Sequence, residues 1–399
     1  MKIKKIICVL AVVILACCCL VACGEKTVEH VHTFSEDWSY DVNSHWHSAT
    51  CGHDEQKSGL GDHVWSEGEV TVNATCYSKG SKVYSCSGCT AKIEEEIPKT
   101  AHSYSSGKIA YKLLDKNVFT VDLCDYCGEE TNLKLVYGAL IASDTASAQR
   151  AINRSKSGDT IFLKAGTYGA LEFMSHKGDD FGNISIVGED NVTVKAITLN
   201  VHQDYAPDNL LIRNINFVGG PDFGGVSSYI EINNLTVKDC SFSGHANLSV
   251  ATNFANNLVV DNCTFTNVES SNSSLTAIYV QKANGITVKN CYFDGVQYNA
   301  LQVGSNELKG AVSITGNTFK NVNSRVIYML KTAGVTSCNI SNNKFYSKET
   351  TLNKSDGNYV KTGEGNVVVG VNYWETIPEA DELYFTEGVT YLPSEQKQL

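Results

Sequence analysis

The sequence predicts an all-β protein whose main part is a parallel β-solenoid. Three observations support this: a repeat, an alternation within it and a column of corner residues. Between Asn209 and Phe345 a nine-residue pattern recurs, and each copy ends in phenylalanine. The copies end at Phe217, Phe242, Phe265, Phe293, Phe319 and Phe345, with spacings of 25, 23, 28, 26 and 26 residues. A period of this size indicates one supersecondary unit stacked on itself.

Apolar and polar residues alternate within each copy, as in Leu235-Thr-Val237 and Ile286-Thr-Val288, so one strand face is buried. The strand is followed by a residue that tolerates the left-handed backbone of a tight corner. This column consists of Asn214, Asp239, Asn262, Asn290, Gly316 and Asn342. The next column, Cys240, Cys263 and Cys291, is predicted to be buried reduced thiols beside an aromatic stack of the phenylalanines.

A third strand is predicted in each repeat, which makes every coil triangular. The segments are Tyr229–Ile232, Asn247–Val250, Ala277–Val280, Ala300–Val303 and Val326–Met329. Strands of successive coils would pair in parallel about 4.8 Å apart. A leucine-rich repeat is the nearest rival, but its Leu-rich Asn signature is absent and the third strand has no helical period.

These features resemble the right-handed parallel β-helix of the pectate-lyase-like superfamily, including its asparagine-bearing corners. The entry to the repeat resembles it as well. Ala146–Lys156 is an amphipathic helix that would cap the open end of the core, and Gly158–Tyr168 is similar to the usual first coil. The resemblance covers roughly residues 140–375 and implies a right-handed β-helix there.

The chain opens with an export signal. Met1–Lys5 is basic and the apolar run Ile6–Ala22 is too short for a spanning helix. The run ends in Leu20-Val-Ala-Cys23, which resembles a bacterial lipoprotein cleavage box. The resemblance implies a signal peptide at 1–22, a lipidated Cys23 and a lipid-anchored linker at 23–29, and so a lipoprotein of the cell envelope that faces outside. A plain signal peptide or a membrane anchor is the alternative.

The charge of the mature chain disfavours nucleic acid and other polyanions, unless a local basic patch or a bound cation reverses the effect. The signal contains three of the 32 basic residues and no acid, so 29 basic and 43 acidic residues remain, a formal charge of −14. Long-range electrostatics then disfavour nucleic acid, and the sequence contains no DNA- or RNA-binding motif. We expect a monomer.

Residues 30–135 are rich in cysteine and histidine. The histidines are His30, His32, His45, His47, His53, His63 and His102, and the cysteines are Cys51, Cys76, Cys86, Cys89, Cys124 and Cys127. The segment resembles Cys/His-rich repeats of surface lipoproteins from anaerobic bacteria. A small domain with few apolar residues needs disulfides or bound metal ions to fold.

The Cys86-Ser-Gly-Cys89 turn holds two thiols at a separation that suits tetrahedral zinc. Cys76, Cys86, Cys89 and His102 would complete a closed structural zinc site. Two alternatives stay open: a disulfide from Cys76 to Cys86 or Cys89, because the protein is exported, and reduced structural thiols.

The end of the chain is predicted to close the solenoid. Asn353–Asn366 is polar and forms a loop, and Val367–Trp374 forms a last turn. Residues 376–399 are a cap or tail, with Glu379–Leu399 as a terminal hairpin or cap that covers unpaired strand edges.

The outward face of the third strand is the predicted binding surface. Tyrosines and amides repeat there at a spacing close to one sugar unit; tyrosine offers a flat apolar face and amides bond hydroxyls. The predicted carbohydrate-binding residues are Tyr229, Glu231, Asn247, Gln281 and Gln302. The alternative is an ordinary solvated sheet face.

The resemblance also implies an activity, because many proteins of this fold are polysaccharide lyases that act on uronates with Lys, Arg or Tyr as base and sometimes with calcium. The residues of the right types are Tyr279, Lys282, Arg325, Tyr328 and Lys331. Signature motifs of the pectate lyases and polygalacturonases are absent, and no outward pair of carboxylates is evident for hydrolysis. The sequence therefore favours a lipid-anchored protein that binds polysaccharide, with a polysaccharide lyase as the alternative and calcium binding undecided.

Overall fold

The computed structural model describes residues 30–173, 182–199, 208–268, 275–346, 360–361, 367–379, 383 and 389–399. The predicted signal peptide, the predicted lipidation site Cys23 and most of the predicted loop 353–366 lie outside the described residues. The chain divides into two compact units, residues 1–102 and 103–399. No helix of the described part is long and apolar enough to cross a membrane.

The first unit contains two small antiparallel sheets. One is β1 (Phe34–Tyr40), β2 (Ser44–Ala49) and β3 (Lys57–Asp62), and the other is β4 (Glu69–Val72), β5 (Gly80–Ser85) and β6 (Lys92–Ile97). Its buried apolar side chains among residues 30–102 are Cys76, Cys86 and Ala91. The sheets are therefore short of apolar core.

A third antiparallel sheet belongs to the second unit, although its sequence continues the Cys/His-rich region. It consists of β7 (Ile109–Leu114), β8 (Asn117–Leu123) and β9 (Glu130–Val136). The β7–β8 hairpin turns at Asp115 and Lys116, both with positive φ, and Val118 and Val121 are buried.

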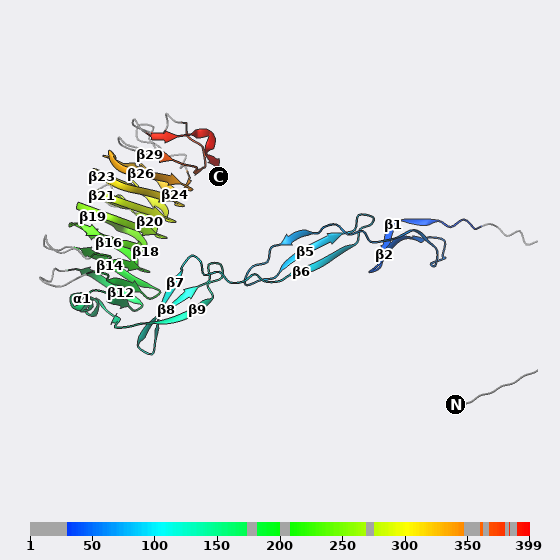
Figure 1. The fold of residues 1–399 in the computed structure, drawn as a ribbon, viewed down its shortest axis with the longest axis horizontal. Helices are drawn as coiled ribbons and strands as arrows, with labels where there is room; N and C mark the ends of the chain where they lie inside the picture. Colours follow the sequence, from blue (N-terminus) through cyan, green and yellow to red (C-terminus); the bar gives the residue numbers. More distant parts are fainter. Residues whose placement is uncertain are drawn as a thin grey trace, which may run out of the picture. The chain divides into compact units, whose positions relative to one another are not determined.

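The helix α1 (Thr145–Arg154) lies where the sequence predicts it, within two residues. Asp144 caps it: its Oδ1 accepts from the Ser147 N–H at 2.7 Å, and the Ser147 hydroxyl accepts from the Asp144 N–H. Ala148, Ala151 and Ile152 are buried in the core that continues through the β-helix. The helix covers the first coil, as expected (Figure 1).

The remaining strands form one continuous parallel β-helix (Figure 1). They are β10 (Leu140–Ala142), β11 (Thr160–Leu163), β12 (Gly166–Glu172), β13 (Ser185–Gly188), β14 (Val192–Leu199), β15 (Leu211–Arg213), β16 (Asn216–Ser228), β17 (Ile232–Asn233), β18 (Thr236–Lys238), β19 (Ser241–Asp261), β20 (Thr264–Val268), β21 (Ile278–Lys289), β22 (Tyr292–Val296), β23 (Leu301–Thr315), β24 (Thr318–Val322), β25 (Ile327–Met329), β26 (Gly334–Ser341), β27 (Lys344–Phe345), β28 (Val360–Lys361), β29 (Val367–Val369), β30 (Tyr373–Trp374), β31 (Val389–Tyr391) and β32 (Lys397–Gln398).

Three faces of parallel strands enclose the core, and on each face inward residues of successive coils are in register. The first face stacks Ile212, Val237, Val260, Val288, Ile314 and Ile340. The second stacks the phenylalanines. The third stacks Val226, Leu248, Ile278, Leu301 and Ile327. The triangular coil expected from the alternation is confirmed.

The corner between the first and second faces confirms the predicted left-handed column. The φ angles are 54° at Asn214, 54° at Asp239, 53° at Asn262, 56° at Asn290, 67° at Gly316 and 57° at Asn342. Asparagine and aspartate adopt this conformation more easily than other non-glycine residues, so the corner selects them.

The aromatic stack is also confirmed: centroids of successive rings from Phe217 to Phe345 lie 4.6–5.2 Å apart, and Trp374 extends the stack. Cys240, Cys263 and Cys291 are buried beside it. Their thiols point to main-chain carbonyls, and burial raises the pKa of Cys263 and Cys291 well above the ordinary value. Thiols in this state act as small core side chains.

The third strand of one coil differs from the prediction. The structure pairs Gly225–Ser228 with Asn247–Val250, so Tyr229 and Glu231 lie beyond the strand rather than on it. The glycines at 224 and 225 obscure the strand in the sequence. A side chain at Gly225 would lie 2.1 Å from the Asn247 carbonyl oxygen, so this close coil contact excludes a Cβ.

The last coils run further than expected. β29 and β30 form the predicted turn at 367–374, and β31 and β32 then pair in parallel with them. The described part of the C-terminal segment therefore adds strands to the first and second faces rather than a hairpin.

Candidate functional site

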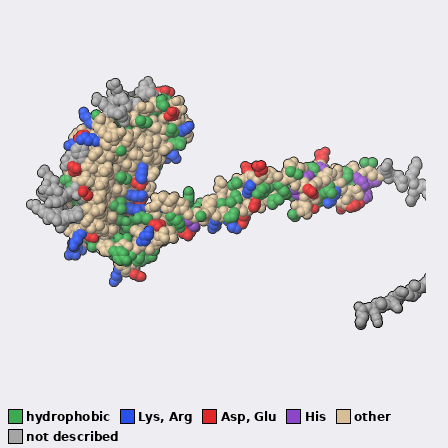
Figure 2. Space-filling model, in the orientation of Figure 1, with side chains coloured by type: hydrophobic (Ala, Val, Ile, Leu, Met, Phe, Trp, Pro, Cys, Tyr) green, Lys and Arg blue, Asp and Glu red, His purple; other side chains and the backbone are tan. Residues whose placement is uncertain are grey.

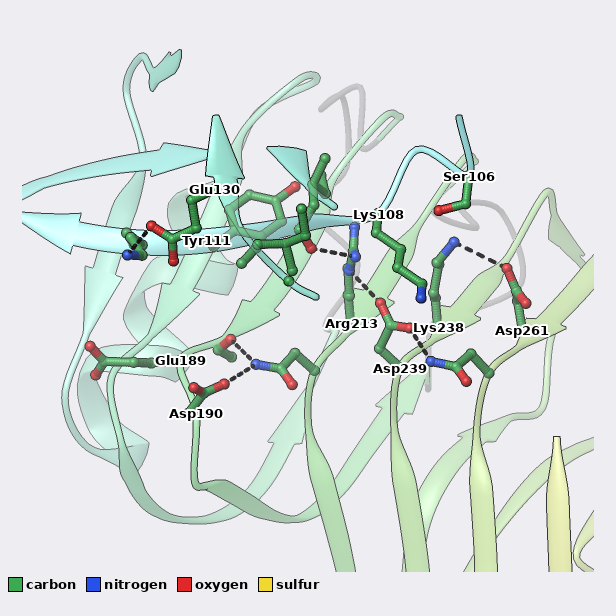
Figure 3. A pocket seen from close by; sticks show the side chains of 18 of the residues that line it. Ser106, Lys108, Tyr111, Glu130, Glu189, Asp190, Arg213, Lys238, Asp239 and Asp261 are labelled. Carbon is green, nitrogen blue, oxygen red and sulfur yellow. Dashed lines mark hydrogen bonds and ion pairs between the residues drawn. The ribbon is translucent and has the colours of Figure 1, made fainter. Parts of the chain in front are cut away.

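A cleft of about 1050 Å³ lies between the β7–β9 sheet and the first-face corner of the β-helix (Figure 3). One side is lined by residues of β7, β8 and β9. The other is lined by strand ends and corners of successive coils. Five basic and five acidic side chains face it: Lys108, Lys112, Arg213, Lys238 and Lys289, and Glu130, Glu189, Asp190, Asp239 and Asp261.

The β-helix side of the cleft carries a row of charged residues, one per coil. Arg213, Lys238, Asp261 and Lys289 are in parallel register, so neighbours lie about one strand spacing apart. Figure 2 shows Lys and Arg side chains gathered along this edge of the β-helix. The corner column beside it adds Asn214, Asp239, Asn262 and Asn290.

Arg213 joins the two sides of the cleft. It is 8% exposed, its Nε lies 2.7 Å from Asp239 Oδ2, and a guanidinium N–H donates to the Ile109 carbonyl at 2.7 Å. A buried guanidinium is tolerated only when it is paired and hydrogen bonded. Arg213 therefore holds β7 against the β-helix.

Asp261 is the centre of the charged row. Its Oδ2 lies 3.1 Å from Lys238 Nζ and 3.7 Å from Lys289 Nζ, and its Oδ1 accepts from the Asn290 amide at 3.1 Å. Burial acts to raise the pKa of Asp261, but these hydrogen bonds and charges outweigh it and hold the pKa below its ordinary value. The carboxylate stays ionised and keeps both lysines oriented.

Replacing Asp261 by Asn is expected to cost about 1–2 kcal/mol of stability at pH 7, between the values for exposed and buried ion pairs. A carboxyl with a lowered folded-state pKa stabilises the fold above its unfolded-state pKa and loses this effect as pH falls through the folded-state value. The gap between wild type and Asp261→Asn in urea unfolding should therefore close between pH 5 and pH 2. Asp190→Asn, an exposed acid of the same cleft, should stay within about 0.5 kcal/mol at every pH. A pH-independent gap for Asp261→Asn would contradict this account.

The sheet side contributes Lys108 and Tyr111. Lys108 points from the sheet toward the row that contains Arg213 and Lys238 (Figure 3). Burial raises the pKa of Tyr111, although the charge of Arg213 acts to lower it. Tyr111 is therefore a neutral hydrogen-bonding group near pH 7 and is not activated as a base. Ammonium groups, carboxylates and amides in such a cleft suit a ligand with many hydroxyl or carboxylate groups.

The predicted catalytic residues lie elsewhere, on the third face and its edges. Tyr279, Gln302 and Tyr328 form one outward column in parallel register and are all half-buried. The Tyr279 hydroxyl lies 3.3 Å from the Ser305 hydroxyl. The guanidinium carbon of Arg325 lies 4.5 Å from the centre of the Tyr328 ring, so the arginine covers one face of this tyrosine.

Lys282 and Lys331 lie past the third strand. Lys282 is half-buried and in register with Glu307 of the next coil, whose carboxylate is paired with Lys309 at 2.5 Å. Lys331 is exposed, with a positive φ of 51°. None of the five predicted catalytic residues lines the cleft.

The predicted sugar-binding residues are placed in different settings. Gln302 is in the outward column and accepts from Asn299 at 2.9 Å, and Gln281 is half-buried on β21. Tyr229 is 50% exposed and Glu231 accepts from Asn256, but both lie off the third strand. Asn247 is not an outward residue: it is 7% exposed and its amide donates to the Thr276 carbonyl, because Gly225 of the preceding coil packs against its backbone.

The cleft could not be found from the sequence. Its β-helix side consists of residues at and beside the corner asparagines. The left-handed corner conformation already explains why asparagine occurs there, so these asparagines do not indicate a binding site. Its other side comes from β7–β9, which the composition assigns to the Cys/His-rich region. The one signal was the pair Arg213 and Lys238, outward cations at the same position of successive repeats.

The predicted zinc ligands are also placed differently. Cys86 and Cys89 lie with His45 and His63, and neither Cys76 nor His102 belongs to this group. Cys76 is buried and His102 is half-buried. A second group consists of His30, His32, Cys51 and His53. Both groups could hold a metal ion, and among the described residues no disulfide links the cysteines. The CxxC spacing identifies two ligands, but only the fold of the preceding sheet decides which histidines meet them.

The stacked coils define a parallel β-solenoid. Residues 182–345 match the family model described as a right handed beta helix region. This part of the chain is a right-handed parallel β-helix.

Among solved structures, two alginate lyases are similar to this chain at low identity. The alginate lyase from Paenibacillus sp. str. FPU-7 is similar at 12% identity and a TM-score of 0.31, over 63% of this chain and 99% of that one. The PL6 family alginate lyase AlyGC is similar at 12% identity and a TM-score of 0.22, over 66% of this chain. The match spans about half of the latter, 53%. No curated protein matches the sequence.

Proposed function

We propose that the chain is a lipid-anchored cell-surface protein whose β-helix binds a uronate-containing polysaccharide in the cleft beside β7–β9. The observation that supports this best is the row of Arg213, Lys238 and Lys289, held at coil spacing by Asp239 and Asp261. Arg213 and Lys238 are one coil apart and Lys238 and Lys289 are two coils apart. Coil spacing is close to the length of one sugar unit, so these cations lie at intervals that match carboxylates along a polyuronate.

The balance of charge separates this ligand from other polyanions. Five acidic side chains share the cleft with the five basic ones, and the mature chain carries a formal charge of −14. Dense phosphates would meet repulsion from these acids. A polyuronate offers one carboxylate per sugar and many hydroxyls, which the corner amides and carboxylates can bond.

The anchor is proposed from Leu20-Val-Ala-Cys23. Acyl chains on Cys23 would contribute about 0.8 kcal/mol per buried methylene, so two or more would tether the protein durably. Incorporation of labelled palmitate in cells, lost on Cys23→Ser, is the expected result. Label that persists in this variant would refute the lipid anchor, and it would have no bearing on the binding proposed for the cleft.

Binding is tested with the chain from Gly24 to Leu399 against alginate, polygalacturonate and neutral dextran, with and without calcium. We expect retention on the polyuronates and weakening by added salt. Replacing both Lys238 and Lys289 by Gln should weaken binding about 10- to 100-fold, because two charge-assisted contacts are lost. Lys309→Gln, which changes a lysine paired with Glu307 outside the cleft, should leave binding unchanged.

Two results would overturn the assignment. Equal affinity of the Lys238/Lys289 variant and wild type, with loss in a Tyr279→Ala/Tyr328→Ala variant, would move the site to the third face. A rise in the ultraviolet absorbance of unsaturated uronate, abolished by Lys282→Ala or Lys331→Ala, would make the protein a lyase rather than a binding module.

A further inference from the structure

Two groups of cysteine and histidine in the first unit have the geometry of metal centres. The Cys2His2 group is His45, His63, Cys86 and Cys89, and the CysHis3 group is His30, His32, Cys51 and His53. In each, one ligand atom from every residue lies within 4.8 Å of the others. Figure 2 shows the histidines gathered toward the end of this unit that contains β1 and β2.

The distances match tetrahedral zinc. Zinc bonds of ~2.3 Å to sulfur and ~2.0–2.1 Å to nitrogen place neighbouring ligand atoms roughly 3.3–3.8 Å apart. Cys86 Sγ lies 3.8 Å from His45 Nδ1, and Cys89 Sγ lies 3.5 Å from His63 Nδ1. In the CysHis3 group, Cys51 Sγ lies 3.3 Å from His32 Nδ1 and 3.5 Å from His53 Nδ1.

The surroundings of the Cys2His2 group orient its ligands. His63 Nε2 lies 2.9 Å from the Asp41 carbonyl, so its proton sits on Nε2 and the Nδ1 lone pair faces Cys89. The Gly88 N–H donates to Cys86 Sγ at 3.3 Å and the Ala91 N–H donates to Cys89 Sγ at 3.4 Å, which stabilises thiolates.

Glycine in the CxxC turn is required by the same geometry. A Cβ on Gly88 would lie 2.9 Å from His45 Cε1, so only glycine lets the turn approach the imidazole this closely. Cysteine pairing alone does not explain the arrangement, because two histidine nitrogens face the sulfurs. It explains the CysHis3 group even less, since Cys51 is the single cysteine of that group.

The positions of the groups show what a metal would do. His45 lies on β2, His63 directly follows β3, and Cys86 and Cys89 lie in the β5–β6 turn, so the Cys2His2 group links the β1–β3 and β4–β6 sheets. The CysHis3 group joins the chain before β1 to the β2–β3 turn. Few apolar side chains of these sheets are fully buried, and small domains of this kind obtain stability from metals or disulfides.

We propose that residues 30–97 hold two structural zinc ions, one in the Cys2His2 group and one in the CysHis3 group, and that zinc binding supplies most of the folding stability of the two sheets. Four protein ligands close each site and leave no position for a substrate, so the role is structural. Thiolate and imidazole ligands in tetrahedral arrangement select zinc over calcium or magnesium.

The test measures zinc in the Gly24–Leu399 chain purified without chelator, by mass spectrometry of the elements. Cys86→Ser/Cys89→Ser and Cys51→Ser/His53→Asn should each lose about one zinc per chain relative to wild type. His47→Asn is the matched control, because His47 shares β2 with His45 and belongs to neither group; its zinc content should equal that of wild type. Unchanged zinc in either double variant would refute that site.

A second measurement uses the wild-type protein, so its outcome does not depend on whether a substituted protein folds. Zinc is removed with a chelator and replaced by Co²⁺, whose absorption reports tetrahedral thiolate ligation. We expect thiolate-to-cobalt bands and, after chelation, loss of amide-exchange protection in β1–β6 while the β-helix keeps its protection. Zinc-free protein with full protection of β1–β6, or with a Cys86–Cys89 disulfide, would overturn the proposal.

Discussion

Replacing Phe265 by Ala is expected to lower the free energy of unfolding of the β-helix by about 3–5 kcal/mol. Phe265 is fully buried, and its ring stacks on Phe242 at 4.6 Å and on Phe293 at 4.9 Å. The substitution removes buried area, leaves a cavity that flanking coils cannot close and deletes two aromatic contacts of about 0.5–1.5 kcal/mol each. Urea unfolding followed by circular dichroism measures the change.

A control variant separates the contribution of ring stacking from the effect of lost side-chain volume. Phe265→Leu keeps most of the volume and should cost less than half as much. Because a solenoid is a chain of neighbouring units, amide exchange should show the largest loss of protection in β20 and in the paired strands β19 and β22. Uniform loss along the β-helix, with equal cost for Ala and Leu, would contradict a locally supported stack.

The parts of the fold that the sequence predicts are those with a local cause. A left-handed corner restricts the residue type at each site, so Asn214, Asp239 and Asn262 form a column that is visible before the structure. The phenylalanines repeat because parallel register places the same position of every coil at the same depth. Each of these causes acts at the same position of every repeat, so it leaves a periodic pattern that can be read from the sequence.

The parts that it misses depend on which segments meet. The third strand at Gly225–Ser228 was hidden because close contact with Asn247 requires glycine, which normally indicates a turn. Cys86 and Cys89 meet His45 and His63 through the pairing of Trp65 with Cys86, a long-range contact that no spacing reveals. The cleft likewise exists only because Arg213 reaches the Ile109 carbonyl, 104 residues away in the chain.

A second column beside the phenylalanine stack is equally hidden, because it changes residue type partway along. Cys291 is followed in the same column by Asn317, Asn343 and Asn372, all fully buried. Each asparagine accepts from the backbone N–H of the preceding coil and donates to a carbonyl of the core. Buried amides are stable in this setting because their polar groups are paired.

Replacing Asn343 by Leu is therefore expected to destabilise the β-helix by about 2–6 kcal/mol, although leucine has the same number and branching of side-chain heavy atoms. Asn343 Oδ1 accepts from the Asn317 backbone N–H at 2.9 Å, and Nδ2 donates to the Ile314 carbonyl at 2.8 Å. Leucine leaves both buried backbone groups without a hydrogen-bond partner, which costs about 1–3 kcal/mol for each group. The cost is measured by urea unfolding, with amide exchange at Asn317 as the local probe.

Two controls decide whether hydrogen bonding is the cause. Asn343→Cys should cost less than Asn343→Leu, because a thiol can donate to Ile314 as Cys291 does to the carbonyls of Lys289 and Val260. Asn342→Gly, at the exposed corner beside it, should change stability by only a few tenths of a kcal/mol, since glycine accepts its φ of 57°. If leucine at 343 proved as stable as asparagine, the column would be held by shape alone, and its amides would need another explanation.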